Sequence, residues 1–190
     1  MKQILVIVPF PMSDKNLEMR KQQLSSVQLS DELEFTFRPV KAGPKNYVSE
    51  ADMVLADITI LEAGLTAETE GFDAVCIDTM SDSGVAALRS SLSIPVVGPG
   101  RASMLMAMML GQRFSIVTMW RKWFHLYEKT VRDLGLQANL ASIKSIDIAP
   151  DNQALLQGKE EEIFPLLEKS ARQAIDDDGA NVILLGSTTM

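Results

Sequence analysis

Apolar residues along the chain form short continuous runs that alternate with longer stretches of helical spacing. A strand buried on both faces is apolar throughout, so the short runs predict strands at 5–8, 34–39, 74–78, 94–97, 114–118, 143–148 and 182–186. The longer stretches predict helices over 13–29, 49–70, 85–92, 102–110, 121–134 and 159–176, with Ser49 as an N-cap. Strands that alternate with helices are typical of an α/β fold with parallel sheets and right-handed crossovers.

Two segments of the chain resemble each other. Residues 72–80 (FDAVCIDTM) and 180–188 (ANVILLGST) are apolar runs that lead to a hydroxyl residue. These hydroxyl residues are Thr79 and Ser187, which lie 108 positions apart. A duplicated α/β unit tends to place its matching strand ends across a cleft, so we predict that Thr79 and Ser187 form a pair.

The strand openings repeat with nearly the same spacing, because residues 5–9 match residues 114–118 at an offset of 109. Two features with almost one offset indicate an internal duplication. We predict two pseudo-symmetric lobes, residues 1–98 and 112–190, joined by a connecting helix or hinge at 99–111.

The second predicted lobe is incomplete. In the first lobe Thr79 is followed by a helix and by the strand at 94–97, and the counterpart of that strand would fall after Met190. A parallel strand that ends there leaves an edge and an uncovered face. We expect the natural protein to be longer, and a naturally short variant is the alternative.

Composition and charge exclude several classes of function. A net charge of −7 and a pI of about 4.8 argue against nucleic-acid binding, which needs a basic face. A single cysteine excludes an internal disulfide and fits a reducing, cytoplasmic location. No apolar run approaches 18 residues, so we expect neither a transmembrane helix nor a membrane partner. Zinc-type ligand spacing, a phosphate-binding glycine loop and a dinucleotide fingerprint are missing, so we expect no metal and no cofactor.

Candidate binding residues lie where the predicted strands end, because ligands of parallel α/β sheets bind beyond the carboxyl ends of the strands. The turn at 81–84 opens a predicted helix, so its N–H groups would favour an anion, although small hydroxyl residues cap helices in many proteins. The residues that we expect to contact a small-molecule substrate are Pro9, Phe10, Met80, Ser81, Thr118, Thr188 and Arg101.

Four segments in order resemble the aspartate/glutamate/hydantoin racemase superfamily, in particular its hydantoin and allantoin racemase branch. They read GFDAVCIDTMSDSG at 71–84, IPVVGPG at 94–100, LGQRFSIVT at 110–118 and GANVILLGSTTM at 179–190. The resemblance implies two α/β lobes with the active site between them, and a homo-oligomer. It also implies racemisation without a cofactor by two cysteines, one per lobe. One thiolate removes the proton at the α-carbon, and the other thiol supplies one to the opposite face.

The chain departs from that family at the reacting groups, because Thr79 and Ser187 hold the two cysteine positions. The family's Asn-Pro-Asn-type opening is also absent, with Val-Pro-Phe-Pro at 8–11 in its place. A free thiol has a pKa of about 8.5, and an alcohol is a far weaker acid. Hydroxyls therefore cannot replace thiols as a two-base pair, but they can donate hydrogen bonds or act as nucleophiles beside a base.

Several neighbours could assist these hydroxyls. Asp78 could serve as a base if it is buried, or its carboxylate could bond to backbone. Asp82 could also assist the hydroxyls, or it could cap the following helix. His125 lies in an aromatic cluster and is expected to pack rather than react, and Cys76 inside its strand is expected to behave as a small hydrophobe. Arg101 could reach a substrate carboxylate or form a surface salt bridge.

Other clusters are expected to be inert. A set of methionines in the helix predicted over 102–110 indicates helix core or a subunit interface rather than a metal site: Met104, Met106, Met108 and Met109. The acids at 176–178 are expected to form a solvated face.

We therefore expect a racemase or isomerase that acts next to the carboxylate or ring carbonyl of a small amino-acid-derived or hydantoin-like substrate. Two-thiol racemisation is not the expected chemistry. Two alternatives stay open: a lyase, decarboxylase or hydrolase on the same scaffold, and a non-catalytic small-molecule binding protein.

Overall fold

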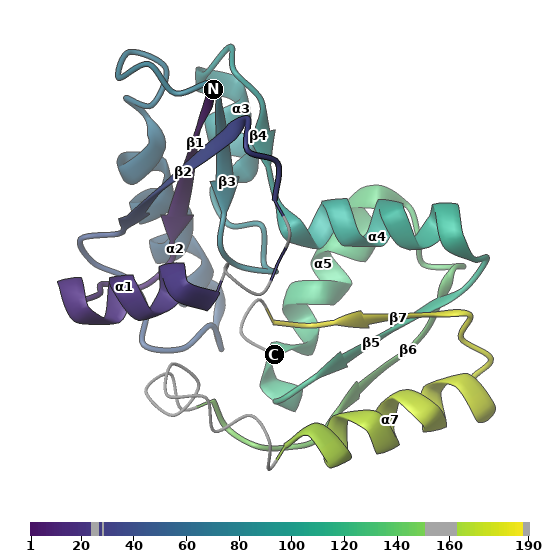
Figure 1. Cartoon of the computed structure of the whole chain (residues 1–190). Coiled ribbons are helices and arrows are strands. Elements are labelled where there is room, and N and C mark those ends of the chain that lie inside the picture. The colour runs from purple at the N-terminus through teal and green to yellow at the C-terminus, as the bar shows by residue number, and fades with distance from the viewer. Residues whose placement is uncertain (24–26, 28, 151–162, 188–190) are drawn as a thin grey trace. The chain divides into compact units, whose positions relative to one another are not determined.

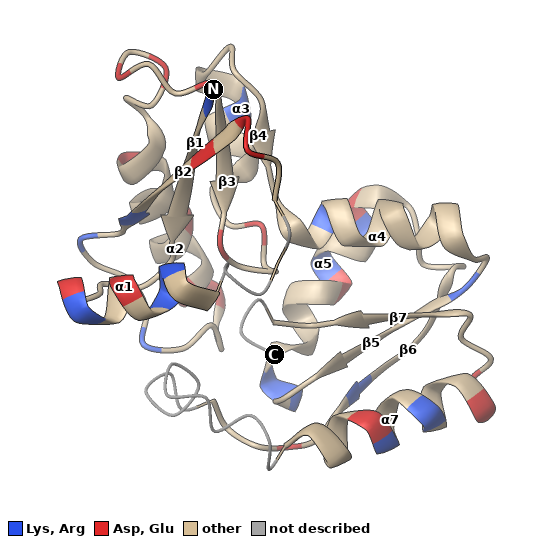
Figure 2. Ribbon diagram, viewed as in Figure 1, with Lys and Arg blue, Asp and Glu red and all other residues tan. Residues whose placement is uncertain are grey.

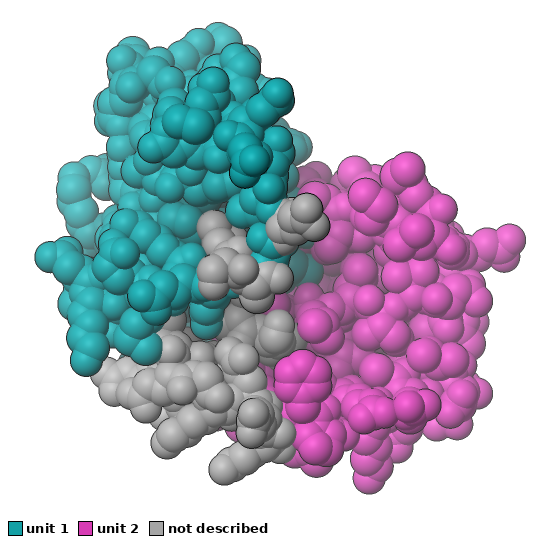
Figure 3. Space-filling model, in the orientation of Figure 1, with its two compact units in different colours: residues 1–99 teal, residues 100–190 magenta. Residues whose placement is uncertain are grey.

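The computed structural model describes residues 1–23, 27, 29–150 and 163–187 (Figure 1). The chain divides into two compact units, Met1–Pro99 and Gly100–Met190 (Figure 3). Each unit has its own parallel sheet, so the predicted α/β fold with two parallel sheets is confirmed. No helix in the described part of the chain has the length and apolar character needed to cross a bilayer.

The sheet of unit 1 has four parallel strands in the order β2-β1-β3-β4. The strand bounds are β1 (Lys2–Val8), β2 (Leu33–Pro39), β3 (Ala74–Ile77) and β4 (Val96–Val97). Helices α1 (Asp14–Gln22), α2 (Glu50–Gly64) and α3 (Val85–Ser91) pack against this sheet.

Alternate residues of β1 face two different hydrophobic clusters. Leu5 and Ile7 pack in the larger cluster with Ile60 of α2 and Leu88 of α3. Val6 and Val8 lie in the smaller cluster, which also contains Leu17 of α1. Because successive strand residues point to opposite faces of a sheet, helices cover both faces of β1, and this explains its continuous apolar run.

The sheet of unit 2 has three parallel strands in the order β6-β5-β7. Its strands are β5 (Phe114–Thr118), β6 (Leu140–Ser145) and β7 (Val182–Leu185). Its helical elements are α4 (Pro99–Leu110, which begins in the last residue of unit 1), the 3₁₀ helix η2 (Arg121–Trp123), α5 (Phe124–Leu134) and α7 (Phe164–Asp176).

Both sheets place their first strand in the middle, with the second strand on one side and the third on the other. This shared order fits the duplication inferred from the sequence. In the described residues of unit 2, no strand corresponds to β4.

Several predicted boundaries differ from the structure. The N-cap at Ser49 is confirmed, because Ser49 and Asp52 form a capping box, but α2 ends at Gly64 rather than near residue 70. A Cβ at Gly64 would lie 2.7 Å from Ile7 Cδ1, so this helix end needs glycine to approach β1. Residues 65–70 form hydrogen-bonded turns instead of further helix.

The helix predicted over 102–110 begins three residues earlier, because α4 starts at Pro99. Proline is accepted at the first helical position, where its missing N–H would have no partner. Strand β6 begins at Leu140, three residues before the predicted start, because Leu140 pairs with Phe114. Part of the helices predicted over 13–29 and 159–176 lies outside the described residues; their described portions are α1 and α7.

Candidate functional site

A row of hydroxyl groups follows the carboxyl end of β3 in unit 1. Thr79 Oγ1 lies 3.2 Å from Ser81 Oγ, which in turn lies 2.9 Å from Ser83 Oγ. Ser81 and Ser83 are buried and Thr79 is half-buried. No carboxylate of the described residues hydrogen-bonds to Thr79. This row is the main polar feature near the predicted reacting position of unit 1.

We predicted that the N–H groups of the turn at 81–84 would favour an anion. In the structure these N–H groups are bonded within the protein instead. The Gly84 N–H donates to Asp57 Oδ1 of α2 at 2.7 Å, and the Val85 N–H donates to the Asp82 carbonyl. The N–H groups of Ser81, Asp82 and Ser83 likewise donate to oxygens of residues 79 and 81. Because the protein already accepts these five hydrogen bonds, the physical basis for an anion site at this turn is lost.

Asp82 is also not the N-cap of α3. Gly84 occupies that position with a φ of 73°, and a Cβ there would lie 2.6 Å from Ile60 Cγ2. Asp82 itself has a φ of 53°, which is uncommon for a residue other than glycine. Its carboxyl group packs against Gly98, where a Cβ would come within 2.5 Å of Asp82 Cγ. The left-handed backbone therefore turns this acid toward the start of α4 instead of toward α3.

Asp78 forms a buried ion pair with Arg20 of α1. Arg20 Nε donates to one carboxylate oxygen at 2.7 Å, and Nη2 donates to the other at 2.5 Å. Each side chain is 9% exposed. Because both oxygens of Asp78 accept from the guanidinium, the structure favours a positioning role over the predicted role as a base. The sequence pattern gave no sign of Arg20.

The carboxyl end of β1 leads into an aromatic contact. Pro9 is buried, and the Phe10 ring meets the Tyr47 ring edge-on at 5.6 Å. Tyr47 is 3% exposed, and none of the residues that the structure describes hydrogen-bonds to its Oη. Burial, followed by the charges of Asp57 and Asp52, raises the pKa of Tyr47, so its hydroxyl stays neutral.

Cys76 behaves as the sequence analysis expected. Its side chain packs against Val6, Val8 and Phe37 in the smaller core cluster. Burial raises the pKa of the Cys76 thiol, and the negative charge of Asp78 raises it further. The thiol is therefore held in its protonated form and is a poor nucleophile.

In unit 2, a buried hydrogen-bond chain lies at the carboxyl ends of β5 and β7. The Tyr127 hydroxyl donates to the Gly186 carbonyl at 2.5 Å, so Thr118 Oγ1, 2.8 Å away, donates to Tyr127 Oη. Thr118 is fully buried, which makes it part of this support rather than a surface for substrate. A Cβ at Gly186 would lie 2.7 Å from Tyr127 Oη, so glycine allows the close approach.

These hydrogen bonds hold Gly186, the residue directly before Ser187. Ser187 itself is half-buried. Tyr127 was missed as a functional candidate, although the aromatic cluster around His125 had been noted. A tyrosine in such a cluster carries a polar group that needs a partner, and that signal points to it.

The aromatic turn after β5 contains two buried nitrogen atoms that lack a hydrogen-bond partner in the described part of the chain. The Trp120 and Trp123 rings meet edge-on at 6.2 Å, and Lys122 Nζ lies 4.8 Å from the centre of the Trp120 ring. Trp123 Nε1 and His125 Nε2 are buried, and no described residue forms a hydrogen bond with either nitrogen. His125 Nε2 therefore has no hydrogen bond to a base or a nucleophile among the described residues.

The other residues that were predicted to contact substrate lie in different surroundings. Arg101 Nη2 forms an ion pair with Asp133 at 3.2 Å, which is the salt bridge that the sequence left open. Met80 is buried at 7% exposure. Thr188 lies outside the described residues. Thr79 and Ser187 belong to different units, so their pairing stays a prediction.

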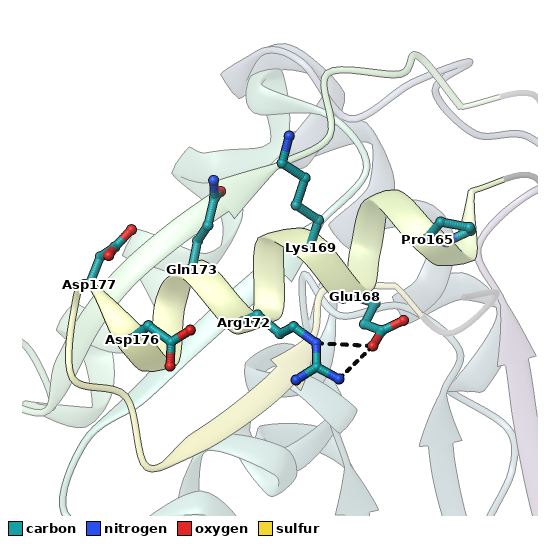
Figure 4. Close-up of a pocket in the computed structure, with 7 residues that line it drawn as sticks. All are labelled: Pro165, Glu168, Lys169, Arg172, Gln173, Asp176 and Asp177. Atoms are coloured by element: carbon teal, nitrogen blue, oxygen red, sulfur yellow. Dashed lines mark hydrogen bonds and ion pairs between the residues drawn. The ribbon is translucent and has the colours of Figure 1, made fainter.

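A shallow hollow lies along α7 (Figure 4). Most of the side chains that line it are charged, and among them Arg172 bonds to Glu168 at 2.7 Å. Asp178, beyond the end of the helix, pairs with Lys144 at 2.7 Å. The Arg172–Glu168 pair is exposed, as expected for a solvated helix face, whereas the Lys144–Asp178 pair is half-buried.

The fold and the strand-end residues define a class of protein with two similar parallel α/β units. The family model described as Asp/Glu/Hydantoin racemase matches residues 13–190. The chain therefore belongs to the Asp/Glu/hydantoin racemase family, as its sequence motifs had suggested.

Individual relatives agree with this assignment. A hydantoin racemase from Pseudomonas sp. (strain NS671) is 30% identical over 155 residues, which cover 79% of this chain and 59% of the relative. The chain thus spans about three fifths of the length of this curated relative. The allantoin racemase from Klebsiella pneumoniae has a similar structure, with a TM-score of 0.86 and 26% identity over 100% of this chain and 76% of the other. An allantoin racemase from Pseudomonas fluorescens gives a TM-score of 0.80 and 27% identity over 99% and 77%.

Proposed function

We propose that the chain is part of a cofactor-independent enzyme of the racemase or isomerase class. Its substrate is a small molecule, either hydantoin-like or derived from an amino acid, and the reaction takes place at the carbon next to a ring carbonyl or carboxylate. The observation that carries this proposal is the similarity to hydantoin racemase along most of the chain, together with the hydroxyl row after β3.

The proposed chemistry does not use two thiols. The chain has one cysteine, Cys76, and its pKa is raised by burial. Thr79 and Ser187 take the positions that the family resemblance assigns to cysteines. Their hydroxyls are proposed to hold the substrate and to move a proton only with the help of a base, because an alcohol does not ionise near neutral pH.

The surroundings of Thr79 favour an uncharged polar ligand. The half-buried Thr79 hydroxyl can donate and accept, which suits the alternating N–H and C=O groups of a cyclic urea or imide, and the buried hydroxyls of Ser81 and Ser83 continue its hydrogen-bond row. Asp57 and Asp82 border the same turn and would repel an anion. A neutral ring therefore fits unit 1 better than a free carboxylate does.

A second candidate function is ligand binding without turnover. The Thr79 hydroxyl bonds to the Ser81 hydroxyl and not to a carboxylate, and Asp78 is already paired with Arg20. A cleft that keeps substrate recognition but lacks a base would bind a ring and release it unchanged. A lyase, decarboxylase or hydrolase on this scaffold would need the same missing base.

Proton exchange and binding separate these candidates. The protein is incubated in deuterated water with hydantoins, allantoin and free amino acids, and loss of the α-proton signal is followed by NMR, while calorimetry measures binding. Enzyme-dependent exchange of a hydantoin-type substrate is expected. Binding without exchange of any substrate would assign the chain to the second candidate, and neither binding nor exchange would overturn both.

A further inference from the structure

Three hydroxyl groups in the row after β3 share two hydrogen bonds. Ser81 Oγ lies 3.2 Å from Thr79 Oγ1 on one side and 2.9 Å from Ser83 Oγ on the other. Among the described residues, no other acceptor is bonded to these three hydroxyls, because their remaining bonds come from the N–H groups of Ser81 and Ser83. A hydroxyl has a single proton to donate. Three protons therefore serve two bonds, and one proton is left over.

The owner of the left-over proton decides the direction of the row. If Thr79 donates to Ser81 and Ser81 donates to Ser83, the proton belongs to Ser83, which is 2% exposed. If Thr79 and Ser83 both donate to Ser81, it belongs to Ser81, which is 4% exposed. Either arrangement buries a donor without an acceptor, which is unfavourable. When Ser83 donates to Ser81 and Ser81 donates to Thr79, the left-over proton belongs to Thr79, the half-buried end of the row.

We propose that Ser81 and Ser83 are positioning residues that make the Thr79 hydroxyl a hydrogen-bond donor toward the ligand. The Thr79 oxygen accepts from the Ser81 hydroxyl, and its own proton points out of the row. Hydrogen bonds in series also polarise one another, which strengthens the last donor. Ser81, which the sequence placed among the substrate contacts, acts here through Thr79.

The ligand must then offer an acceptor to Thr79. In a hydantoin-like ring this acceptor is the carbonyl oxygen next to the α-carbon, because the proposed reaction takes place at that carbon. The inference thus rests on the proposed ligand class, but it applies whether the ligand is turned over or only bound.

The charges near the row favour a carbonyl oxygen over a carboxylate. No Lys or Arg occurs over residues 71–88, and Figure 2 shows the segment from β3 to the start of α3 with acidic but no basic residues. The guanidinium of Arg20 is already paired with Asp78. A carboxylate at Thr79 would meet the negative charge of these acids, whereas a neutral carbonyl would not.

Neutron diffraction from crystals of the whole chain in deuterated water tests the direction of the row without a ligand. Deuterium bonded to Ser83 is expected to point at Ser81 Oγ, and deuterium bonded to Ser81 is expected to point at Thr79 Oγ1. The deuterium of Thr79 is expected to point out of the row. If it lies between Thr79 Oγ1 and Ser81 Oγ, the inference is overturned whatever the protein binds.

Calorimetry with modified rings tests what Thr79 donates to. Ethyleneurea keeps both N–H groups of hydantoin but lacks the carbonyl next to the α-carbon. The wild type is expected to bind hydantoin about tenfold more tightly than ethyleneurea, and Thr79→Val is expected to lose most of this preference. Thr79→Ser keeps the hydroxyl and is expected to retain it. An unchanged preference in Thr79→Val would overturn the inference.

A ring without N–H groups tests the opposite direction. N,N′-dimethylhydantoin keeps both carbonyl groups, and its loss of affinity relative to hydantoin is expected to be the same in the wild type and in Thr79→Val. A loss that disappears in Thr79→Val would show that Thr79 accepts from a ligand N–H, and the proposed direction would be wrong.

Serine variants test the positioning role. Ser81→Ala is expected to lower the preference for hydantoin over ethyleneurea about threefold, and Ser83→Ala is expected to lower it less. Ser142→Ala is the matched control, because it breaks a hydroxyl pair of the same 2.9 Å length with Ser115 in unit 2, and it is expected to change neither affinity. Equal losses for both ligands in Ser81→Ala, with the fold checked by circular dichroism, would show that the serine only supports the structure.

The two levels of the argument fail separately. If the folded wild type binds none of these rings, the proposed ligand class is overturned, and with it the carbonyl as the partner of Thr79. The direction of the row is still decided by the deuterium positions.

Discussion

The Tyr127 hydroxyl donates a 2.5 Å hydrogen bond to the backbone carbonyl of Gly186, 59 residues away and directly before Ser187. The same hydroxyl lies 2.8 Å from Thr118 Oγ1, so one side chain of α5 joins the carboxyl ends of β5 and β7. Ser187 therefore follows a backbone position that is fixed by a buried contact. A residue proposed to act on substrate gains a defined position from this support.

We predict that Tyr127→Phe destabilises the protein by about 1–3 kcal/mol, because the ring stays but the Gly186 carbonyl and the Thr118 hydroxyl lose their partner. Urea unfolding measures the change. Tyr47→Phe is the matched control: the Tyr47 Oη has no hydrogen-bond partner within the described ranges, so its removal is expected to be neutral or stabilising. Equal losses in the two variants would contradict the assigned role of Tyr127.

The Arg20–Asp78 pair gives a second prediction. Each side chain is 9% exposed, so Arg20→Met leaves a buried carboxylate without its main partner and is expected to cost about 3–5 kcal/mol. The double variant Arg20→Met/Asp78→Leu is expected to recover most of that loss, since both charges are then gone. Arg172→Met, which breaks an exposed pair with Glu168, serves as the control and is expected to change little. A loss in the double variant equal to the sum of the single losses would show that the two residues are not coupled.

The sequence pattern predicted best those elements that are defined by continuous burial or local capping. Strand β5 was predicted to the residue, and all five of its side chains are buried. The start of α2 followed from Ser49, whose capping box involves only residues three apart. The start of α4 was missed because a proline flanked by glycines usually breaks a chain, and only tertiary structure shows that Pro99 is the first helical residue.

The contacts around the candidate site could not be predicted in the same way. Arg20 and Asp78 are 58 residues apart, and Asp57 reaches Gly84 across 27 residues. Such pairs leave no periodic signal, because packing of α1 and α2 on the sheet brings them together. The sequence therefore identified the strand end at Thr79, but could not show that its neighbouring acid and its turn N–H groups already have partners.

Cys76 allows a test of pH dependence. Burial, with the charge of Asp78, raises the pKa of its thiol in the folded chain above that of the unfolded chain. The neutral thiol therefore contributes stability that is complete below about pH 8.5, the ordinary pKa, and is lost as the pH rises through the raised value. We predict slow labelling by a disulfide reagent at neutral pH, faster labelling above pH 9, and immediate labelling in urea. Rapid labelling of the folded protein at pH 7 would contradict a buried, protonated Cys76 thiol. Because this thiol is not proposed to react, the Cys76→Ala variant is expected to keep any proton-exchange activity.

The positions of Thr79 and Ser187 can be tested by giving them the thiols that the family resemblance places there. Thr79→Cys alone supplies one ionisable group, so it is expected to exchange the α-proton of a hydantoin without inverting the carbon. Thr79→Cys/Ser187→Cys supplies a base and an acid on opposite faces and is expected to racemise it, with a rate about 10²-fold or more above wild type. Polarimetry follows racemisation and NMR follows exchange.

Ser81→Cys/Ser187→Cys is the matched control, because Ser81 belongs to the same hydroxyl row but holds a different position relative to β3. It adds the same number of thiols but only one at a proposed reacting position, so it is expected to exchange the α-proton without racemising the substrate faster than the wild type. If this control racemises as fast as Thr79→Cys/Ser187→Cys, the specific pairing of residues 79 and 187 is wrong. If the Thr79→Cys/Ser187→Cys variant is folded, binds the substrate and still leaves the α-proton in place, the two residues do not flank a common carbon.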